Sequence, residues 1–178
     1  MILVVNVCKE QLHYYEFVGP VLKVLSNASK DYFVVNYDEV TPEYLEKADK
    51  VIICGTSLYD NQYLEDIPKF SWIWDYDKPI FGICAGCQVI QLIFGGKVEH
   101  IKEVGSVDIE FDQEFLGVIG KRKVYSLHQN FISSPEFDVY GKSKDCAHAV
   151  KHKAKEIYGC LFHPEVYNHD ILENFCKI

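Results

Sequence analysis

The chain has 178 residues, 48% of them hydrophobic and 14% aromatic, which is enough to build the core of one domain over residues 1–178. Its formal net charge of −8 argues against nucleic acid as a partner, because a phosphate backbone requires a basic surface. We find no apolar run long enough to span a bilayer, so we expect no membrane contact. The seven cysteines are scattered and odd in number, which favours a cytoplasmic location.

The first half of the chain predicts alternating strands and helices. We expect buried strands at 1–7, 33–35, 50–55 and 80–83. Helices are expected at 14–25, from Thr41 onward and at 85–94, and Gly19-Pro20 is expected to kink or delay the first of them. Residues near 64–74 lead to the fourth strand. This alternation predicts a parallel sheet with right-handed crossovers.

The second half predicts short strands that pair mainly in the antiparallel sense. Their expected ranges are 97–101, 106–111, 123–126, 139–143, 148–151 and 156–162, followed by a helix at 168–176. The fold class is therefore α/β, with a central, mostly parallel sheet and a small antiparallel sheet.

A cysteine stands between the fourth strand and the helix that follows it, in the sequence Gly82-Ile83-Cys84-Ala85-Gly86. The pattern G-x-C-x-G is the thiol form of a nucleophile elbow, in which a tight turn exposes the reactive side chain. Glycines fit at both ends of such a turn because a Cβ would crowd it. The helix N-terminus favours a thiolate and offers free N–H groups to an oxyanion.

Cys84 and Cys87 also form a C-x-x-C pair, which is compatible with a redox pair or half a zinc site. A zinc site would need a second close pair of cysteines or histidines, and none is evident, so we expect no metal and no cofactor.

A base for the thiol is supplied by His163-Pro164-Glu165. The proline favours extended backbone at His163, and residues two apart in extended chain project to the same side. We therefore expect Glu165 to orient one ring nitrogen of His163 while the other faces Cys84.

Other residues are expected to line the same pocket. Gly55 ends the third strand, and its N–H could join that of Ala85 in an oxyanion hole. Gln88 lies one turn into the helix, where it could face the site or cap a loop. His128 lies in a polar loop and is by itself more typical of a structural histidine.

Together these residues resemble a class I (triad) glutamine amidotransferase, whose motifs G-x-C-x-G-x-Q and H-P-E occur here in the family's order. The resemblance implies a flavodoxin-like, three-layer fold. It also implies hydrolysis of L-glutamine through a thioester on Cys84, with His163 as proton shuttle and Glu165 as its orienter. The residues implied to bind the oxyanion and the substrate are Gly55, Ala85, Gln88 and His128.

The stretch after Ala149 resembles the separate glutaminase subunit of archaeal-type GMP synthases. That resemblance implies that the partner is a separate ATP-dependent synthetase subunit, since the synthetase motif S-G-G-x-D-S is absent from this sequence. The chain departs from the family pattern at Gly55-Thr56-Ser57, Cys87 and Asn130. Three alternatives stay open: the chain supplies ammonia to another synthetase, it hydrolyses another amide or γ-glutamyl compound, or it is a non-catalytic regulatory module.

Overall fold

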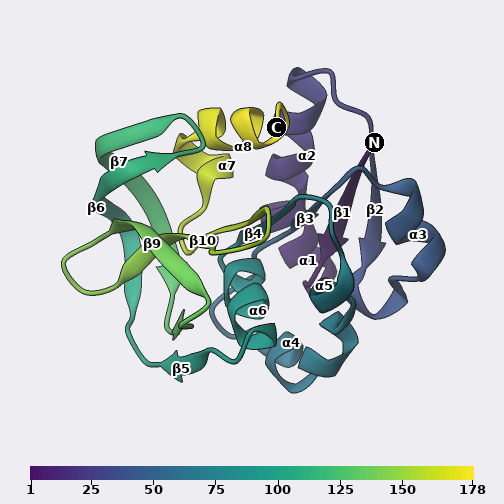
Figure 1. Cartoon of the computed structure of the whole chain (residues 1–178), viewed down its shortest axis with the longest axis horizontal. Helices are drawn as coiled ribbons and strands as arrows, with labels where there is room; N and C mark the ends of the chain where they lie inside the picture. Colours follow the sequence, from purple (N-terminus) through teal and green to yellow (C-terminus); the bar gives the residue numbers. More distant parts are fainter.

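A nine-stranded sheet forms the centre of the computed structural model, which describes residues 1–178 (Figure 1). Its first part is parallel and runs in the order β2 (Tyr32–Asn36), β1 (Ile2–Asn6), β3 (Lys50–Ile53), β4 (Ile80–Ile83) and β11 (Ile157–Cys160). Antiparallel strands extend it in the order β10 (Ala147–His152), β9 (Phe137–Lys142), β6 (Glu103–Phe115) and β7 (Val118–His128). A separate antiparallel pair joins β5 (Lys97–Glu99) to β8 (Phe131–Ser133). The predicted α/β class and small antiparallel sheet are confirmed.

Short helices connect the parallel strands. The α-helices are α1 (Gln11–His13), α2 (Gly19–Asn27), α3 (Pro42–Lys47), α4 (Gln62–Glu65), α5 (Trp72–Asp75), α6 (Ala85–Ile93), α7 (Pro164–Tyr167) and α8 (His169–Phe175). A π-helical turn, η1 (Tyr14–Val18), precedes α2, and two 3₁₀ turns lie at η2 (Tyr37–Glu39) and η3 (Ile67–Phe70). The regular helix α2 begins only at Gly19, with Pro20 in its first turn, so the structure shows the delay that was one of the two effects expected of Gly19-Pro20.

Alternation along the strands divides the core into two layers. In β1, Ile2 and Val4 pack with α2 and α8, whereas Leu3 and Val5 pack with α6 on the opposite face. Both faces of the parallel strands are therefore covered by helices, as a run of apolar residues without polar alternation predicts. No helix of the structure is long and apolar enough to cross a membrane.

The hairpin of β6 and β7 is longer than the strands expected at 106–111 and 123–126. It continues to a two-residue turn at Leu116 and Gly117, whose φ values of 49° and 79° are those of a type I′ turn. The outer part of the hairpin was missed because a register irregularity between Phe111 and Phe115 interrupts the alternation of apolar and polar residues.

Three neighbouring parallel strands end side by side, which positions the site. Ile53 at the end of β3 lies beside Gly82 of β4, and Ile83 at the end of β4 lies beside Cys160 of β11. The segments that follow these strands contain the elbow cysteine, the glycine loop and the histidine. Loops at the carboxyl ends of parallel strands meet at one crevice, which brings the three segments together.

Candidate active site

Cys84 occupies a strained turn between β4 and α6. Its φ of 47° and ψ of −102° are rare for a residue with a side chain, and its N–H donates to the Cys160 carbonyl at 2.8 Å. A methyl group at Gly82 would lie 2.5 Å from the Gly86 backbone, and one at Gly86 would lie 2.2 Å from the Ile53 carbonyl oxygen. Both glycines are required by close packing, as the sequence predicts.

The Cys84 thiol is 4% exposed and donates a long hydrogen bond of 3.5 Å to the Leu127 carbonyl. Cys87, the second cysteine of the C-x-x-C pair, lies in the core, and its sulfur is close to Gly159 of β11. Burial raises the pKa of the Cys87 thiol, so this side chain stays protonated and unreactive. The arrangement favours Cys84 as a lone nucleophile over a redox pair.

His163 and Glu165 lie side by side in the interior, at 1% and 5% exposed. The Nδ1 atom of His163 is 2.7 Å from Oε1 of Glu165. The expected extended backbone is present at His163, with φ −105° and ψ 90°, but α7 begins at Pro164. The contact therefore arises because Glu165 lies in the first turn of a helix that His163 precedes, not because both residues are extended.

The charge on His163 is set by its neighbours. Burial lowers the pKa of His163, but the charges of Glu165 and Cys84 outweigh burial and hold this pKa well above its usual value. The imidazole therefore holds its proton beside Oε1 of Glu165. The backbone of His163 is fixed by a 2.8 Å hydrogen bond from its N–H to the Tyr125 carbonyl of β7.

Gly55 lies against the side chains of Cys84 and His163. A methyl group there would be 2.7 Å from Cε1 of His163 and 3.2 Å from Cβ of Cys84. Ala85 is the first residue of α6, so its N–H has no partner within the helix. The structure thus places both Gly55 and Ala85 beside Cys84.

The loop after Gly55 is held by a buried carboxylate. Oδ2 of Asp60 accepts hydrogen bonds from the Thr56 hydroxyl and the Lys9 N–H, both at 2.8 Å. Sequence analysis did not identify Asp60. An acid four residues beyond Thr56 was the available signal, but nothing in the sequence places Lys9 of another loop beside it.

Both polar atoms of the Gln88 side chain are engaged within the protein. Its Oε1 accepts from the Tyr63 hydroxyl at 2.6 Å, and its Nε2 donates to the Asn130 carbonyl at 2.9 Å. Gln88 therefore joins α6 to the loop after β7, the loop-capping alternative. It still lines the small pocket beside Cys84. Tyr63 is a second residue that sequence analysis missed.

His128 lines the same pocket but directs its ring away from the triad, towards Glu103. Nδ1 of His128 is 3.1 Å from the Ile101 carbonyl, and Nε2 is 3.0 Å from Oε2 of Glu103. Burial opposes ionisation of Glu103, but hydrogen bonds from His148, Ser143 and His128 prevail and lower its pKa to about 2.

A buried thiol, an imidazole oriented by a carboxylate, and adjacent backbone N–H groups are the elements of covalent acyl transfer. Residues 13–177 match the family model of glutamine amidotransferase class-I. The chain belongs to the class I glutamine amidotransferase family.

Among its curated relatives is a subunit of the glutamine-hydrolyzing GMP synthase of Pyrococcus abyssi, which is 39% identical over 116 residues. That match covers 58% of this chain and 62% of the relative. The corresponding subunit from Methanocaldococcus jannaschii is 38% identical over 112 residues, covering 56% of this chain and 60% of the relative. The chain spans about three fifths of the length of these relatives.

The fold is shared with solved structures. A structure from Thermoplasma acidophilum, described as a GMP synthase subunit, has a TM-score of 0.87 at 26% identity and covers 99% of this chain and 92% of its own. A glutamine amidotransferase from Thermotoga maritima has a TM-score of 0.73 at 17% identity, with 97% of this chain and 79% of its own covered. These matches confirm the predicted flavodoxin-like fold.

Proposed function

We propose that this chain, as one amidotransferase domain over residues 1–178, hydrolyses L-glutamine to glutamate and ammonia. This proposal rests on the strained turn that holds the Cys84 thiol beside the buried His163–Glu165 pair. The family of the chain supports glutamine as the amide substrate.

In the first step, the Cys84 thiolate attacks the side-chain amide carbon of glutamine. The N–H groups of Gly55 and Ala85 donate to the oxyanion as it forms. His163 then gives its proton to the departing nitrogen, the C–N bond breaks, and ammonia leaves behind a γ-glutamyl thioester on Cys84.

In the second step, water attacks the thioester. His163 accepts a proton from this water, while Glu165 stabilises the imidazolium that results. Cleavage of the C–S bond releases glutamate and restores the thiolate beside protonated His163. No metal or cofactor takes part in this proposed cycle.

We propose further that the ammonia passes to a separate ATP-dependent synthetase subunit. GMP synthase, in which the ATP-pyrophosphatase subunit converts XMP to GMP, is favoured because relatives named for a subunit of that enzyme are 36–39% identical to the chain. The free cysteines are compatible with the cytoplasmic location that this role implies.

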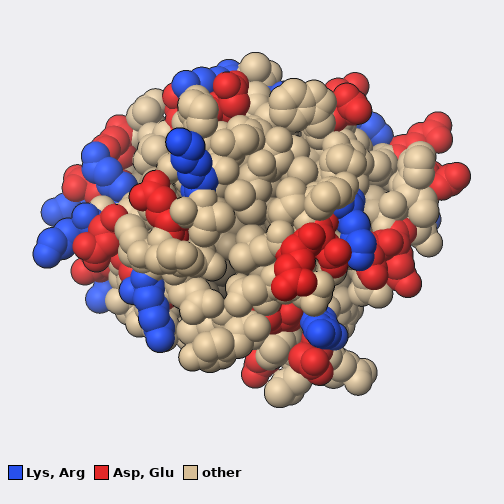
Figure 2. Space-filling model, turned by 90° about the horizontal axis from the view of Figure 1, so that it is seen from below, with Lys and Arg blue, Asp and Glu red and all other residues tan.

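A docking surface for such a partner is available around the site. Exposed aromatic side chains lie on three segments that flank it, namely Tyr15 of η1, Tyr59 after β3 and Tyr167 of α7. Figure 2 shows the face towards which the arrowheads of β1 and β2 point in Figure 1, and its centre is largely uncharged. Uncharged surface rimmed by charge is typical of protein interfaces.

Replacement of Cys84 by Ala tests the hydrolysis. Glutamate release should be abolished, and a reactive glutamine analogue should add mass to Cys84 in the wild-type chain only. Undiminished glutamate release from Cys84→Ala would refute the nucleophile. Labelling of Cys84 by a reactive analogue of a different amide, but not by the glutamine analogue, would support the alternative substrate class.

Addition of a purified GMP synthetase subunit tests the partner. Stimulated glutamate release and formation of GMP would support the assignment. Turnover without any response to that subunit would favour another synthetase. Binding without turnover would favour the regulatory alternative.

A further inference from the structure

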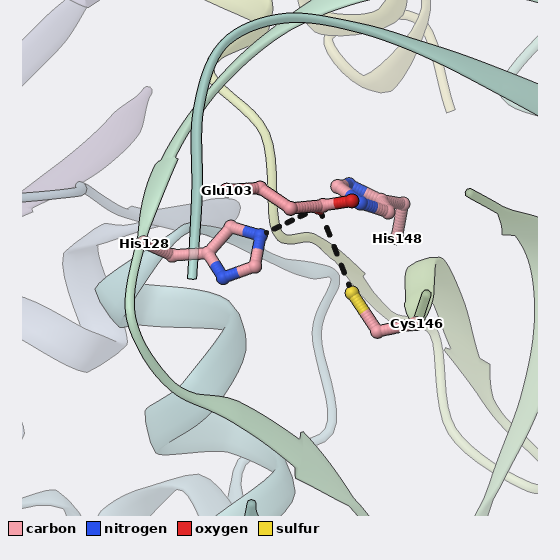
Figure 3. Close-up of side chains that lie close together, drawn as sticks. All are labelled: Glu103, His128, Cys146 and His148. Carbon is pink, nitrogen blue, oxygen red and sulfur yellow. Dashed lines mark hydrogen bonds and ion pairs between the residues drawn. The ribbon is translucent and has the colours of Figure 1, made fainter. Parts of the chain in front are cut away.

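Four side chains that can each donate an electron pair to a metal ion converge beside the active site. They are Glu103, His128, Cys146 and His148, and their donor atoms all lie within 4.8 Å of one another (Figure 3). None of the four takes part in the proposed cycle, and three of them are buried.

Strand register brings these donors together. Glu103 begins β6 and lies directly opposite His128, the last residue of β7. His148 lies in β10, and Cys146 lies in the bend just before that strand, where its N–H donates to the Ser143 hydroxyl at 3.2 Å. Three of the four donors therefore lie in strands, which limits the rearrangement that ligand binding would require.

Three of the side chains point at a single oxygen atom. Oε2 of Glu103 is 3.0 Å from Nε2 of His128, 2.5 Å from Nε2 of His148 and 3.7 Å from Sγ of Cys146. Figure 3 shows His128 and Cys146 approaching this carboxylate from different sides. Its other oxygen accepts from the Ser143 hydroxyl at 2.9 Å, which orients the group.

Two hydrogen-bond acceptors flank the ring of His128, which calls for positive charge there, either on a doubly protonated ring or on a bound cation. Its Nδ1 faces the Ile101 carbonyl and its Nε2 faces the Glu103 carboxylate, and both partners can only accept hydrogen bonds. A neutral imidazole has one N–H and one lone pair, so it would direct a lone pair at an oxygen. If Nδ1 donates to Ile101, the free Nε2 lone pair becomes the metal donor, an arrangement common among histidine ligands.

We infer that Glu103, His128, Cys146 and His148 bind one divalent transition-metal ion, with Zn²⁺ as the expected occupant. Two imidazoles, one thiolate and one carboxylate form a donor set that suits Zn²⁺, and four protein ligands make a closed structural site. The charges also balance, because the thiolate and the carboxylate neutralise a divalent ion. A neutral buried centre avoids the desolvation cost of an unpaired charge.

Binding forms four metal–ligand bonds and releases the Cys146 thiol proton to solvent. The metal would hold together the ends of β6 and β7 and the start of β10. It would stand next to Leu127, whose carbonyl accepts the hydrogen bond of the Cys84 thiol. The inferred role is therefore to fix the wall of the active site, and the inference does not depend on glutamine being the substrate.

Cobalt binding tests the inference without any activity assay. The background is the full chain with Cys84→Ala, because Cys84 and His163 are themselves a thiol–imidazole pair. After treatment with a chelator, this protein should take up one Co²⁺ per chain, show the absorption of a tetrahedral cobalt–thiolate centre, and release Co²⁺ when Zn²⁺ is added.

In the same background, Cys146→Ser should abolish the thiolate band. It should also weaken Co²⁺ binding by more than about 10–100-fold, the range typical for loss of an outer-shell partner. Cys176→Ser is the matched control, since this free cysteine ends the chain's last helix and should leave the band unchanged. Circular dichroism verifies that each variant is folded.

Failure of the background protein itself to bind Co²⁺ or Zn²⁺ stoichiometrically would overturn the inference, and this result needs no site variant. A cobalt–thiolate band that persists in Cys146→Ser would overturn it as well. In that case the cluster is a hydrogen-bonded pair of histidines on a carboxylate.

Discussion

Replacing Gly55 by Ala tests whether close packing holds the catalytic pair in place. The added methyl carbon would lie 2.7 Å from Cε1 of His163, whereas carbon atoms in contact are about 3.5–4.0 Å apart. The ring or the loop must therefore move by about 0.8 Å. Overpacking of this kind costs about 1–3 kcal/mol of stability, and a shift near 1 Å at reacting groups costs about 10²-fold in rate.

Two measurements separate these effects. Glutamate release reports the reaction, and the rate at which iodoacetamide alkylates Cys84 reports the thiolate–imidazolium pair without any substrate. Both rates should fall far more than the loss of folded protein, followed by urea unfolding, could explain.

The matched control is Gly19→Ala. Gly19 has ordinary helical backbone and only one distant neighbour, a carbonyl oxygen 3.9 Å from the added carbon. This variant should keep both rates and gain up to about 1 kcal/mol. Wild-type rates in Gly55→Ala would refute the packing argument, because the loop would then yield without moving His163.

Further predictions concern Glu165 of the triad and two residues near it, Asp60 and Tyr63. Glu165→Gln should slow both glutamate release and Cys84 alkylation by about 10²-fold or more at neutral pH, since the imidazolium loses its anion. The raised pKa of His163 means that Glu165 stabilises the fold fully below the unfolded pKa, near 6.5, and loses this effect as pH rises through the folded pKa. Urea unfolding of wild type and Glu165→Gln should therefore differ most at mildly acidic pH, near about 6, and converge at high pH. Asp60→Ala should cost about 2–4 kcal/mol in the same assay, because two hydrogen-bond donors lose their acceptor, and Asp60→Asn should cost less. Tyr63→Phe should cost about 1–3 kcal/mol by leaving Oε1 of Gln88 unpaired, and equal stability of the two proteins would contradict this account.

The sequence predicted the parts of the site that short motifs encode. The turn at Cys84 follows from two glycines and a strand–helix boundary. The His163–Glu165 contact was expected from two-residue spacing in extended chain, but it forms because Glu165 lies in the first turn of α7. The position of Gly55 followed from the rule that parallel strands end at one crevice. All three depend on local geometry or on the order of strands, and both leave a pattern in the sequence.

Asp60 and the outer β6–β7 hairpin could not be predicted in this way. Asp60 acquires its importance from Lys9, which reaches it from a different loop. The hairpin continues past Phe111 through an irregular register, where alternation no longer indicates a strand.

Sequence analysis expected no metal, although four potential metal donors converge in the fold. That expectation rested on the absence of a second close pair of cysteines and histidines, yet Cys146 and His148 are such a pair, separated by one residue. Cys146 lies in the bend before β10, so the alternation of a strand does not predict that these two side chains converge. The remaining ligands come from the paired ends of β6 and β7, a register that the sequence does not state.

Strand β7 connects this cluster to the triad. The carbonyl of Tyr125 fixes the His163 backbone, the carbonyl of Leu127 accepts from Cys84, and the next residue, His128, belongs to the cluster. The parallel strands thus present the nucleophile, while an antiparallel strand fixes the histidine and contacts the thiol. Because residues 125–128 are contiguous in one strand, a shift of His128 displaces the two carbonyls as well. The geometry of the catalytic pair therefore depends on how the cluster holds the end of β7.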